Sequence, residues 1–276
     1  MEKQRSCPSC GSFGVVRYGK RKGAQRWECR DCGAVFTAAT GTPFSSAKLS
    51  PAKRETVLSM IVRDCTVGDV ADIAKVSTRT AYVWRMKAFT AVAERQKTVM
   101  LSGKIWIDEF AVPVNAGGRI TKNGRMLRGM SRNQIIVAAA VDSSGRRIAL
   151  VAGRGHITGA ECVAVYGSHI SKGSTVVHDG IYSHRRLIAF LGCRDEVRKA
   201  GEPGSKKAMQ PINSFCAAME RCLVKHIGGR SEYIGLYVAW SAFKGCMARA
   251  KIGERVAELE AWCFLSGTDF KVKDRY

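Results

Sequence analysis

Cys7-Pro8-Ser9-Cys10-Gly11 is answered by Cys29-Arg30-Asp31-Cys32-Gly33, and these two stretches decide the fold of the N-terminal segment. The spacing between the pairs is that of a four-cysteine zinc site. The glycine after each pair can adopt the positive φ angle that turns backbone amides towards the thiolates. Four sulfur ligands complete a tetrahedron around Zn²⁺, so we expect a structural zinc ribbon. A redox-active dithiol or a chance pairing is the alternative.

A helix-turn-helix unit is predicted directly after the ribbon. Ser50 can cap a first helix that has Pro51 at its first position. A second, short helix fits residues 67–75, and Ser77 or Thr78 can cap a third that runs to about residue 95. This is the arrangement of DNA-binding helix-turn-helix domains, although three-helix units also serve as plain packing modules.

The third predicted helix has two faces. One carries apolar residues at helical spacing and should pack inward: Ala81, Trp84, Ala88 and Val92. The other should meet base edges. On it we place Arg79, Val83 and Met86, flanked by Thr80, Tyr82 and Lys87, and we assign DNA contacts to Arg79, Thr80, Tyr82 and Val83.

The charge of the chain favours a polyanionic partner. The 276 residues include 45 Lys and Arg against 23 Asp and Glu, a formal net charge of +22. Nucleic acid fits this excess better than an anionic membrane surface, because the basic residues are spread along the whole chain. No apolar run is long enough to span a bilayer, and no signal peptide is expected. We therefore expect a cytoplasmic, nucleoid-associated protein whose eleven cysteines are metal ligands and buried thiols.

Beyond about residue 100 the sequence predicts an α/β domain with a mixed sheet covered by helices. Strand-prone runs are expected at 104–107, 134–141, 147–151 and 174–177, and helices at 160–169, 182–191, 212–224, 233–250 and 254–264. Asp108 and Asp179 each follow a predicted strand, and inner strands of one sheet can hold them side by side. Two such carboxylates repel each other unless divalent metal ions bind between them. An aspartate at a strand end is more ordinarily a turn former. His178 and His184 flank Asp179, and we leave both outside the catalytic set.

Four stretches resemble the Merlin-like group of insertion-sequence transposases. They are Cys29–Thr37 with Thr40-Gly41-Thr42-Pro43-Phe44, then Trp106–Phe110, His178-Asp179-Gly180, and Ile212–Phe215. The resemblance covers nearly the whole chain and implies a multi-domain protein. Its expected parts are a zinc ribbon over residues 1–46, a helix-turn-helix domain over 47–98 and an RNase H-like catalytic domain over 99–276.

By the same resemblance, Asp108 and Asp179 are the first two ligands of catalytic Mg²⁺ or Mn²⁺, and Asn213 stands in the place of the third. Much of the family has Glu at that place. The family also often has Lys seven residues further on, where this chain has Glu220 followed by Arg221. Either Arg221 makes the phosphate contact or Glu220 supplies the carboxylate. Alternatively, Asn213 only caps its helix.

The expected function is that of a transposase, which cuts DNA at the ends of an element and joins the freed 3′-hydroxyl to target DNA. The partners would be double-stranded DNA and further copies of the chain, because two element ends must be handled together. The alternatives are a zinc-ribbon and helix-turn-helix DNA-binding regulator, a catalytically inactive transposase derivative, or a nuclease without joining activity.

Overall fold

The computed structural model describes residues 5–21, 23–45, 48–113, 134–224, 233–266 and 270. The chain divides into two compact units. The N-terminal unit contains Met1–Glu94 together with Lys251–Tyr276, and the sheet unit contains Arg95–Ala250. Residues 251–276, which the sequence analysis placed with the catalytic domain, therefore group with the N-terminal segment. Among the described helices, none has the length and apolar character needed to cross a membrane.

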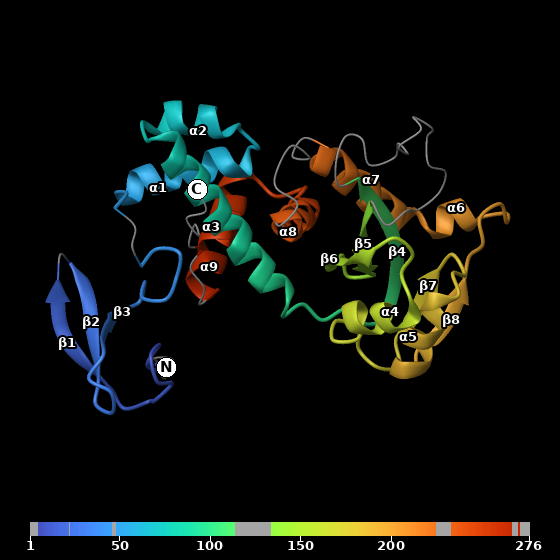
Figure 1. The fold of residues 1–276 in the computed structure, drawn as a ribbon, viewed down its shortest axis with the longest axis horizontal. Helices are drawn as coiled ribbons and strands as arrows, with labels where there is room; N and C mark the ends of the chain where they lie inside the picture. Colours follow the sequence, from blue (N-terminus) through green and yellow to red (C-terminus); the bar gives the residue numbers. More distant parts are fainter. Residues whose placement is uncertain are drawn as a thin grey trace, which may run out of the picture. The chain divides into compact units, whose positions relative to one another are not determined.

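A three-stranded antiparallel sheet forms the first part of the N-terminal unit (Figure 1). Its strands are β1 (Val15–Arg21), β2 (Ala24–Cys29) and β3 (Val35–Thr37). The buried core beneath it consists of Cys7, Cys29 and Phe36. A core of this size provides little hydrophobic stabilisation, so a metal held by the cysteines would supply much of the folding energy.

Three helices follow: α1 (Pro51–Val62), α2 (Val67–Ala74) and α3 (Thr78–Gln96). The predicted caps are confirmed, since Ser50 Oγ accepts from the Lys53 N–H and Ser77 Oγ from the Thr80 N–H. A reciprocal capping box of Thr66 and Asp69 begins α2. The predicted inward stripe of α3 is also confirmed: Ala81, Trp84, Ala88 and Val92 are buried.

The segment Thr42-Pro43-Phe44 packs into this unit. The Phe44 ring lies 5.7 Å from the Trp84 ring and 4.5 Å from that of Phe264 on α9 (Ile252–Leu265). Lys87 Nζ donates to the Pro43 carbonyl at 2.8 Å. Arg54 of α1 pairs with Glu260 of α9, the helix that also carries Phe264, at 2.9 Å.

These contacts correct two expectations for α3. Met86 and Lys87 were placed on or beside the outward face, yet Met86 is fully buried and Lys87 is 6% exposed. Lys87 is buried because the segment Thr42-Pro43-Phe44 covers its side of α3, and the Pro43 carbonyl accepts a hydrogen bond from its ammonium group. Helical spacing alone cannot show that a helix is covered on more than one side.

The sheet unit contains a five-stranded mixed sheet in the order β6-β5-β4-β7-β8. Its strands are β4 (Lys104–Pro113), β5 (Gln134–Asp142), β6 (Arg147–Arg154), β7 (Thr175–His178) and β8 (Arg194–Val197). The first three pair antiparallel, whereas β7 runs parallel to β4 and to β8. The strand predicted at 104–107 continues to Pro113, so Asp108 lies within a strand and not at its end.

Helices cover both faces of this sheet (Figure 1). Buried side chains of α4 (Gly159–Tyr166) and α5 (Ser183–Leu191) pack on the face that carries Ile105 and Ile107. Those of α7 (Gln210–Val224) and α8 (Ile234–Cys246) pack on the face that carries Phe110 and Val177. The short helix α6 (Ser205–Ala208) precedes α7. The inner strand β5 is buried along its whole length, as expected for a strand between two helical layers.

Candidate active site

The four cysteines of the ribbon form one cluster. One sulfur of each, from Cys7, Cys10, Cys29 and Cys32, lies within 4.8 Å of all the others. Sulfurs of opposite knuckles approach to 3.6 Å, from Cys7 to Cys32 and from Cys10 to Cys29. Gly11 and Gly33 have the predicted positive φ angles, +77° and +71°. The cluster could bind zinc as a closed tetrahedral set, which leaves no position for a substrate.

Asp108 lies in β4, and Asp179 directly follows the last residue of the neighbouring strand β7. The parallel pairing of β4 and β7 joins Lys104 to Thr175 and Trp106 to Val177, and the same register continued by two residues aligns the two aspartates. Adjacent strands are about 4.8 Å apart. Because side chains alternate along a strand, Asp108 follows Trp106 onto the α7 side of the sheet. Asp179 lies just past the end of β7, and one of its carboxylate oxygens lies within 4.8 Å of ring nitrogens of His178 and His184.

The environment of Asp108 suits a bound cation. Burial raises the pKa of its carboxyl to about 6, with the charges of Glu109 and Asp179 adding to the effect and the Glu109 N–H and His184 opposing it. Its Oδ1 accepts from the Glu109 N–H at 2.9 Å. A partly buried carboxylate beside a second one offers hard oxygen ligands, which fit Mg²⁺ or Mn²⁺.

Helix α7 presents both candidates for the third ligand on one stripe. Asn213, Cys216 and Glu220 are three and four residues apart and share a face of the helix. Burial raises the pKa of the Cys216 thiol, and the charges of Asp108 and Glu220 add to the effect. Asn213 and Glu220 are both exposed, as is Arg221 near the end of the helix.

A buried polar chain lies on the opposite face of the sheet. His184 Nε2 lies 3.0 Å from Glu109 Oε2, His184 Nδ1 lies 2.9 Å from His178 Nδ1, and His178 Nε2 lies 2.9 Å from Asp195 Oδ1. The Tyr166 hydroxyl donates to Glu109 Oε1 at 2.8 Å. Glu109 was absent from the sequence-based set and both histidines were left out of it. A polar residue beside each aspartate was the available signal.

The proton positions in this chain follow from one backbone donor. The Gly180 N–H donates to His178 Nδ1 at 3.1 Å, so that nitrogen carries no proton and His184 Nδ1 must donate to it. Burial lowers the pKa of His184, but the hydrogen bond and charge of Glu109 outweigh it and the net shift is upward. For His178, burial lowers the pKa and outweighs the opposing hydrogen bond to Asp195. The His184–Glu109 pair therefore holds a proton between its two members.

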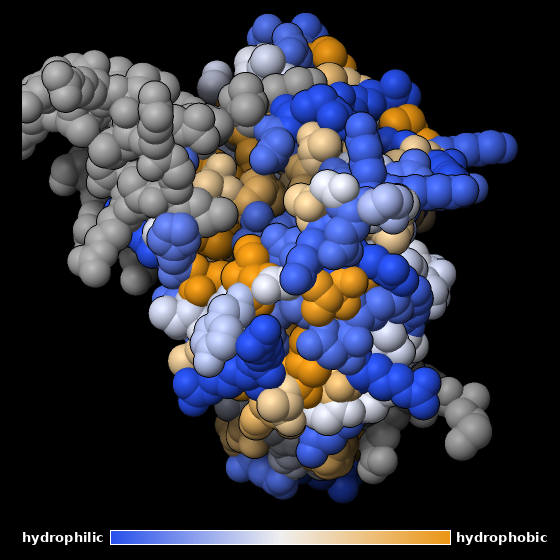
Figure 2. Space-filling view, turned by 90° about the vertical axis from the view of Figure 1, so that its right-hand side faces the viewer, coloured by the Kyte–Doolittle hydropathy of each residue, from blue (hydrophilic) through white to orange (hydrophobic). Residues whose placement is uncertain are grey.

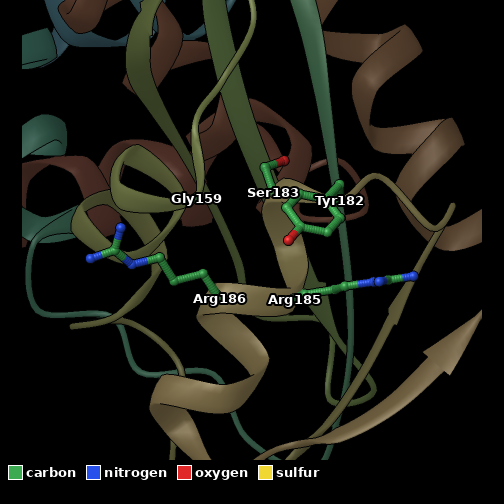
Figure 3. Close-up of a pocket in the computed structure, with 5 residues that line it drawn as sticks. All are labelled: Gly159, Tyr182, Ser183, Arg185 and Arg186. Atoms are coloured by element: carbon green, nitrogen blue, oxygen red, sulfur yellow. The ribbon is translucent and has the colours of Figure 1, made fainter.

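A pocket of about 390 Å³ lies where α5 begins, shortly after Asp179 (Figure 3). Gly159, Tyr182, Ser183, Arg185 and Arg186 line it. The two arginine side chains extend in opposite directions in Figure 3, and the Arg185 guanidinium lies 5.2 Å from the centre of the Tyr182 ring. Tyr182 is 78% exposed. An exposed ring beside cations is a combination found where single-stranded nucleic acid stacks.

Further exposed basic side chains occur in and around β8 and α6 of the sheet unit. Figure 2 shows the side of the molecule on which α6 and β8 lie in Figure 1, with hydrophilic residues dominating and hydrophobic ones scattered among them. Between residues 194 and 207, the exposed cations are Arg194, Arg198, Lys199, Lys206 and Lys207. Arg198 also pairs with Glu196 at 2.7 Å.

The residues assigned to DNA contact on α3 lie at its N-terminal half. Arg79 is exposed, while Thr80, Tyr82 and Val83 are half-buried. The Thr80 hydroxyl lies 2.8 Å from that of Ser77, so part of its hydrogen-bonding capacity serves the start of the helix. The geometry thus leaves Arg79 the most accessible of the four.

Comparison with known proteins gives one distant relative. The chain is 30% identical over 126 residues to an uncharacterized protein in transposable element ISH50 of Halobacterium salinarum. The match covers 45% of this chain and 42% of that protein, so less than half of the relative is matched. No protein family model matches the chain. A structure of a simian T-cell lymphotropic virus intasome in complex with PP2A regulatory subunit B56 gamma aligns with a TM-score of 0.36 and 10% identity, over 68% of this chain and 67% of that one. At that TM-score the likeness does not establish a shared fold.

Proposed function

We propose that the chain is a transposase that cuts and joins DNA with Mg²⁺ or Mn²⁺ bound by Asp108, Asp179 and a third ligand from α7. The observation that carries the proposal is that Asp108 of β4 and Asp179, directly after β7, lie two residues beyond the paired positions Trp106 and Val177 of neighbouring parallel strands. The relation to a protein of a transposable element supports it. So does the mixed sheet between two helical layers, which is the layout expected of an RNase H-like domain.

The proposed chemistry is an in-line displacement at phosphorus. Two bound metal ions would activate the attacking water or 3′-hydroxyl and stabilise the leaving oxygen. Asp108 and Asp179 would hold them where β7 ends beside β4. Asn213 is our first choice for the third ligand and Glu220 the second, while Arg221 is placed to contact a phosphate.

DNA binding would be shared between the two units. The zinc ribbon and helix-turn-helix would hold the element end, with Arg79 the main base-reading residue on α3. The surface cations of the sheet unit would contact the phosphate backbone near the cut. Such a protein would handle two ends as a homo-oligomer. We propose domain limits of 1–46, 47–98 and 99–250 for these functions, with α9 assisting the helix-turn-helix.

Nicking of supercoiled plasmid DNA tests the proposal. The plasmid would carry the sequences that flank the coding region, with Mg²⁺ or Mn²⁺ added. We expect Asp179→Asn to abolish nicking while leaving DNA binding intact, and Glu202→Gln, which changes an exposed carboxylate of the same unit, to have no effect. Nicking without joined products would indicate a nuclease. DNA binding without nicking by the wild type would indicate a regulator or an inactive derivative.

A further inference from the structure

The two aspartates lie just beyond the backbone pairing that holds their strands together. The hydrogen-bonded register of β4 and β7 ends at Trp106 and Val177, two residues before Asp108 and Asp179. At that point β4 continues in its pairing with β5 alone, and the chain after β7 turns into the segment that leads to α5. The separation of the two carboxylates therefore needs another determinant.

Glu109 and His178, which are the sequence neighbours of the two aspartates, lie on the face of the sheet that α5 covers. Glu109 follows Asp108 and His178 precedes Asp179, and alternation along each strand directs both towards α5. His184 of α5 lies between them, with its two ring nitrogens 3.0 Å from Glu109 Oε2 and 2.9 Å from His178 Nδ1. One imidazole ring thus connects the two strands behind the site.

This connection is stiff because it is buried and its polar atoms are satisfied. Glu109, His178 and His184 are 8%, 1% and 0% exposed. The Tyr166 hydroxyl donates to Glu109 and also lies 3.2 Å from the Asp108 carbonyl oxygen. Breaking one link would leave a buried polar group without a partner, which costs more than the bond itself contributes.

We propose that Glu109, His184 and His178 are positioning residues that hold Asp108 and Asp179 at the separation required for divalent metal ions. The inference rests on the proposed function. None of the three would touch the DNA or the metal. Residues behind metal ligands commonly orient them, and their loss weakens metal affinity by about 10–100-fold.

A metal site made by these residues themselves is the competing explanation. Glu109, Cys162 and His184 place ligand atoms within 4.8 Å of one another, as do His178, Asp179 and His184. The hydrogen bonds already satisfy both His184 nitrogens and His178 Nδ1, and burial raises the pKa of the Cys162 thiol to about 11. Both observations favour hydrogen bonding over coordination.

The test is Mn²⁺ binding by the full-length protein, measured by titration calorimetry, together with its zinc content, thermal stability and affinity for DNA. We expect His184→Ala to weaken Mn²⁺ binding at least 10-fold while zinc content and DNA affinity stay at wild-type values. Leu187→Ala is the matched control, because it removes a buried side chain of the same helix that makes no hydrogen bond. It should lower thermal stability and leave Mn²⁺ affinity unchanged.

A conservative pair separates positioning from packing. Glu109→Gln keeps an acceptor for Tyr166 and can donate to a neutral His184, so we expect near-normal Mn²⁺ affinity, whereas Glu109→Ala should match His184→Ala. If His184→Ala fails to fold, a second variant replaces it. Asp195 is hydrogen-bonded to His178 at the exposed end of the row of polar side chains, and Asp195→Ala should still weaken Mn²⁺ binding several-fold.

Three outcomes overturn the inference. The first is an unchanged Mn²⁺ affinity in folded His184→Ala or, if that variant does not fold, in Asp195→Ala. The second is a Leu187→Ala control that weakens Mn²⁺ binding as strongly. The third is that the wild-type protein holds a stoichiometric metal besides the ribbon zinc and that His184→Ala loses it. That result would make Glu109, His184 and His178 metal ligands. If wild-type protein binds no Mn²⁺ and Asp108→Asn changes nothing, the proposed function fails as well. Binding that depends on Asp108 but not on His184 rejects the positioning role alone.

Discussion

The Trp106 indole N–H donates to the carbonyl oxygen of Ala208 at 2.8 Å and so ties β4 to the segment that enters α7. Asp108 is two residues beyond Trp106, about 7 Å along the strand. Counted from Gln210, where α7 begins, Asn213 is about 5 Å along the helix and Glu220 about 15 Å along it. The bond therefore favours Asn213 over Glu220 as the partner of Asp108.

This relationship predicts the result of two alanine substitutions. We expect Asn213→Ala to reduce metal-dependent cleavage by at least 10-fold and Glu220→Ala to reduce it only slightly, because only the first removes a ligand. Cleavage rates with Mg²⁺ and with Mn²⁺ provide the measurement. Loss confined to Glu220→Ala would transfer the ligand role to that residue. Asn213→Asp should retain activity or change the preferred metal.

The raised pKa of Asp108 predicts a pH-dependent gain of stability in Asp108→Asn. Folding raises this pKa from 3.8 to about 6, so the carboxylate opposes folding fully above pH 6 and not at all below pH 4. The shift corresponds to at most ~3 kcal/mol, and incomplete burial reduces it to about 1–2 kcal/mol. Denaturant unfolding without metal should show the variant more stable at pH 8 and equal to wild type near pH 3. Added Mg²⁺ should stabilise the wild type alone; equal stability at pH 8 would contradict the assignment.

Removal of one ribbon cysteine should release zinc. Cys29 is 1% exposed at the centre of the small ribbon core, so Cys29→Ser should lose the metal and unfold the residues before α1. Metal analysis and proteolysis would show both effects. Cys193→Ser, outside the cluster and half-buried, should keep one zinc per chain. Full zinc content in Cys29→Ser would rule out the site.

Arg79→Ala should affect sequence-specific binding more than general binding. An exposed cation near the start of a recognition helix contributes about 1–3 kcal/mol of base discrimination. Titrations at fixed salt should therefore show a larger loss on element-end DNA than on random duplex. Arg63→Ala removes an exposed charge at the end of α1 and should weaken both equally. Equal losses for Arg79→Ala would reduce its role to a phosphate contact.

Phe44→Ala should destabilise the N-terminal unit. Phe44 is 5% exposed and packs against Trp84 and Phe264, and truncation of a buried Phe costs about 3–5 kcal/mol. The control is Phe13→Ala, because Phe13 belongs to the same unit and is 63% exposed. Chemical unfolding should distinguish them clearly. Similar midpoints for the two variants would show that Phe44 does not anchor the unit.

Sequence patterns predicted the features that depend on interactions between residues close together in the chain. The cysteine spacing, the Ser50 and Ser77 caps and the stripe through Trp84 depend on near neighbours in the chain. The strand β8 was missed because Arg194-Asp195-Glu196-Val197 is mostly charged and is held at the sheet edge by pairing with β7. The partnership of Glu109 with His184 joins residues 75 positions apart. No periodicity encodes such a contact, so the polar chain behind the aspartates could not be foreseen.

The packing of α9 against α1 makes the N-terminal unit discontinuous in sequence, since the whole sheet unit is inserted between its two parts. During synthesis the ribbon and first three helices emerge early but lack the helix that carries Phe264. The sheet unit, complete by residue 250, can fold on the ribosome first. The N-terminal unit would then be complete only after α9 has been translated, so chains that end before residue 252 should lack its final fold.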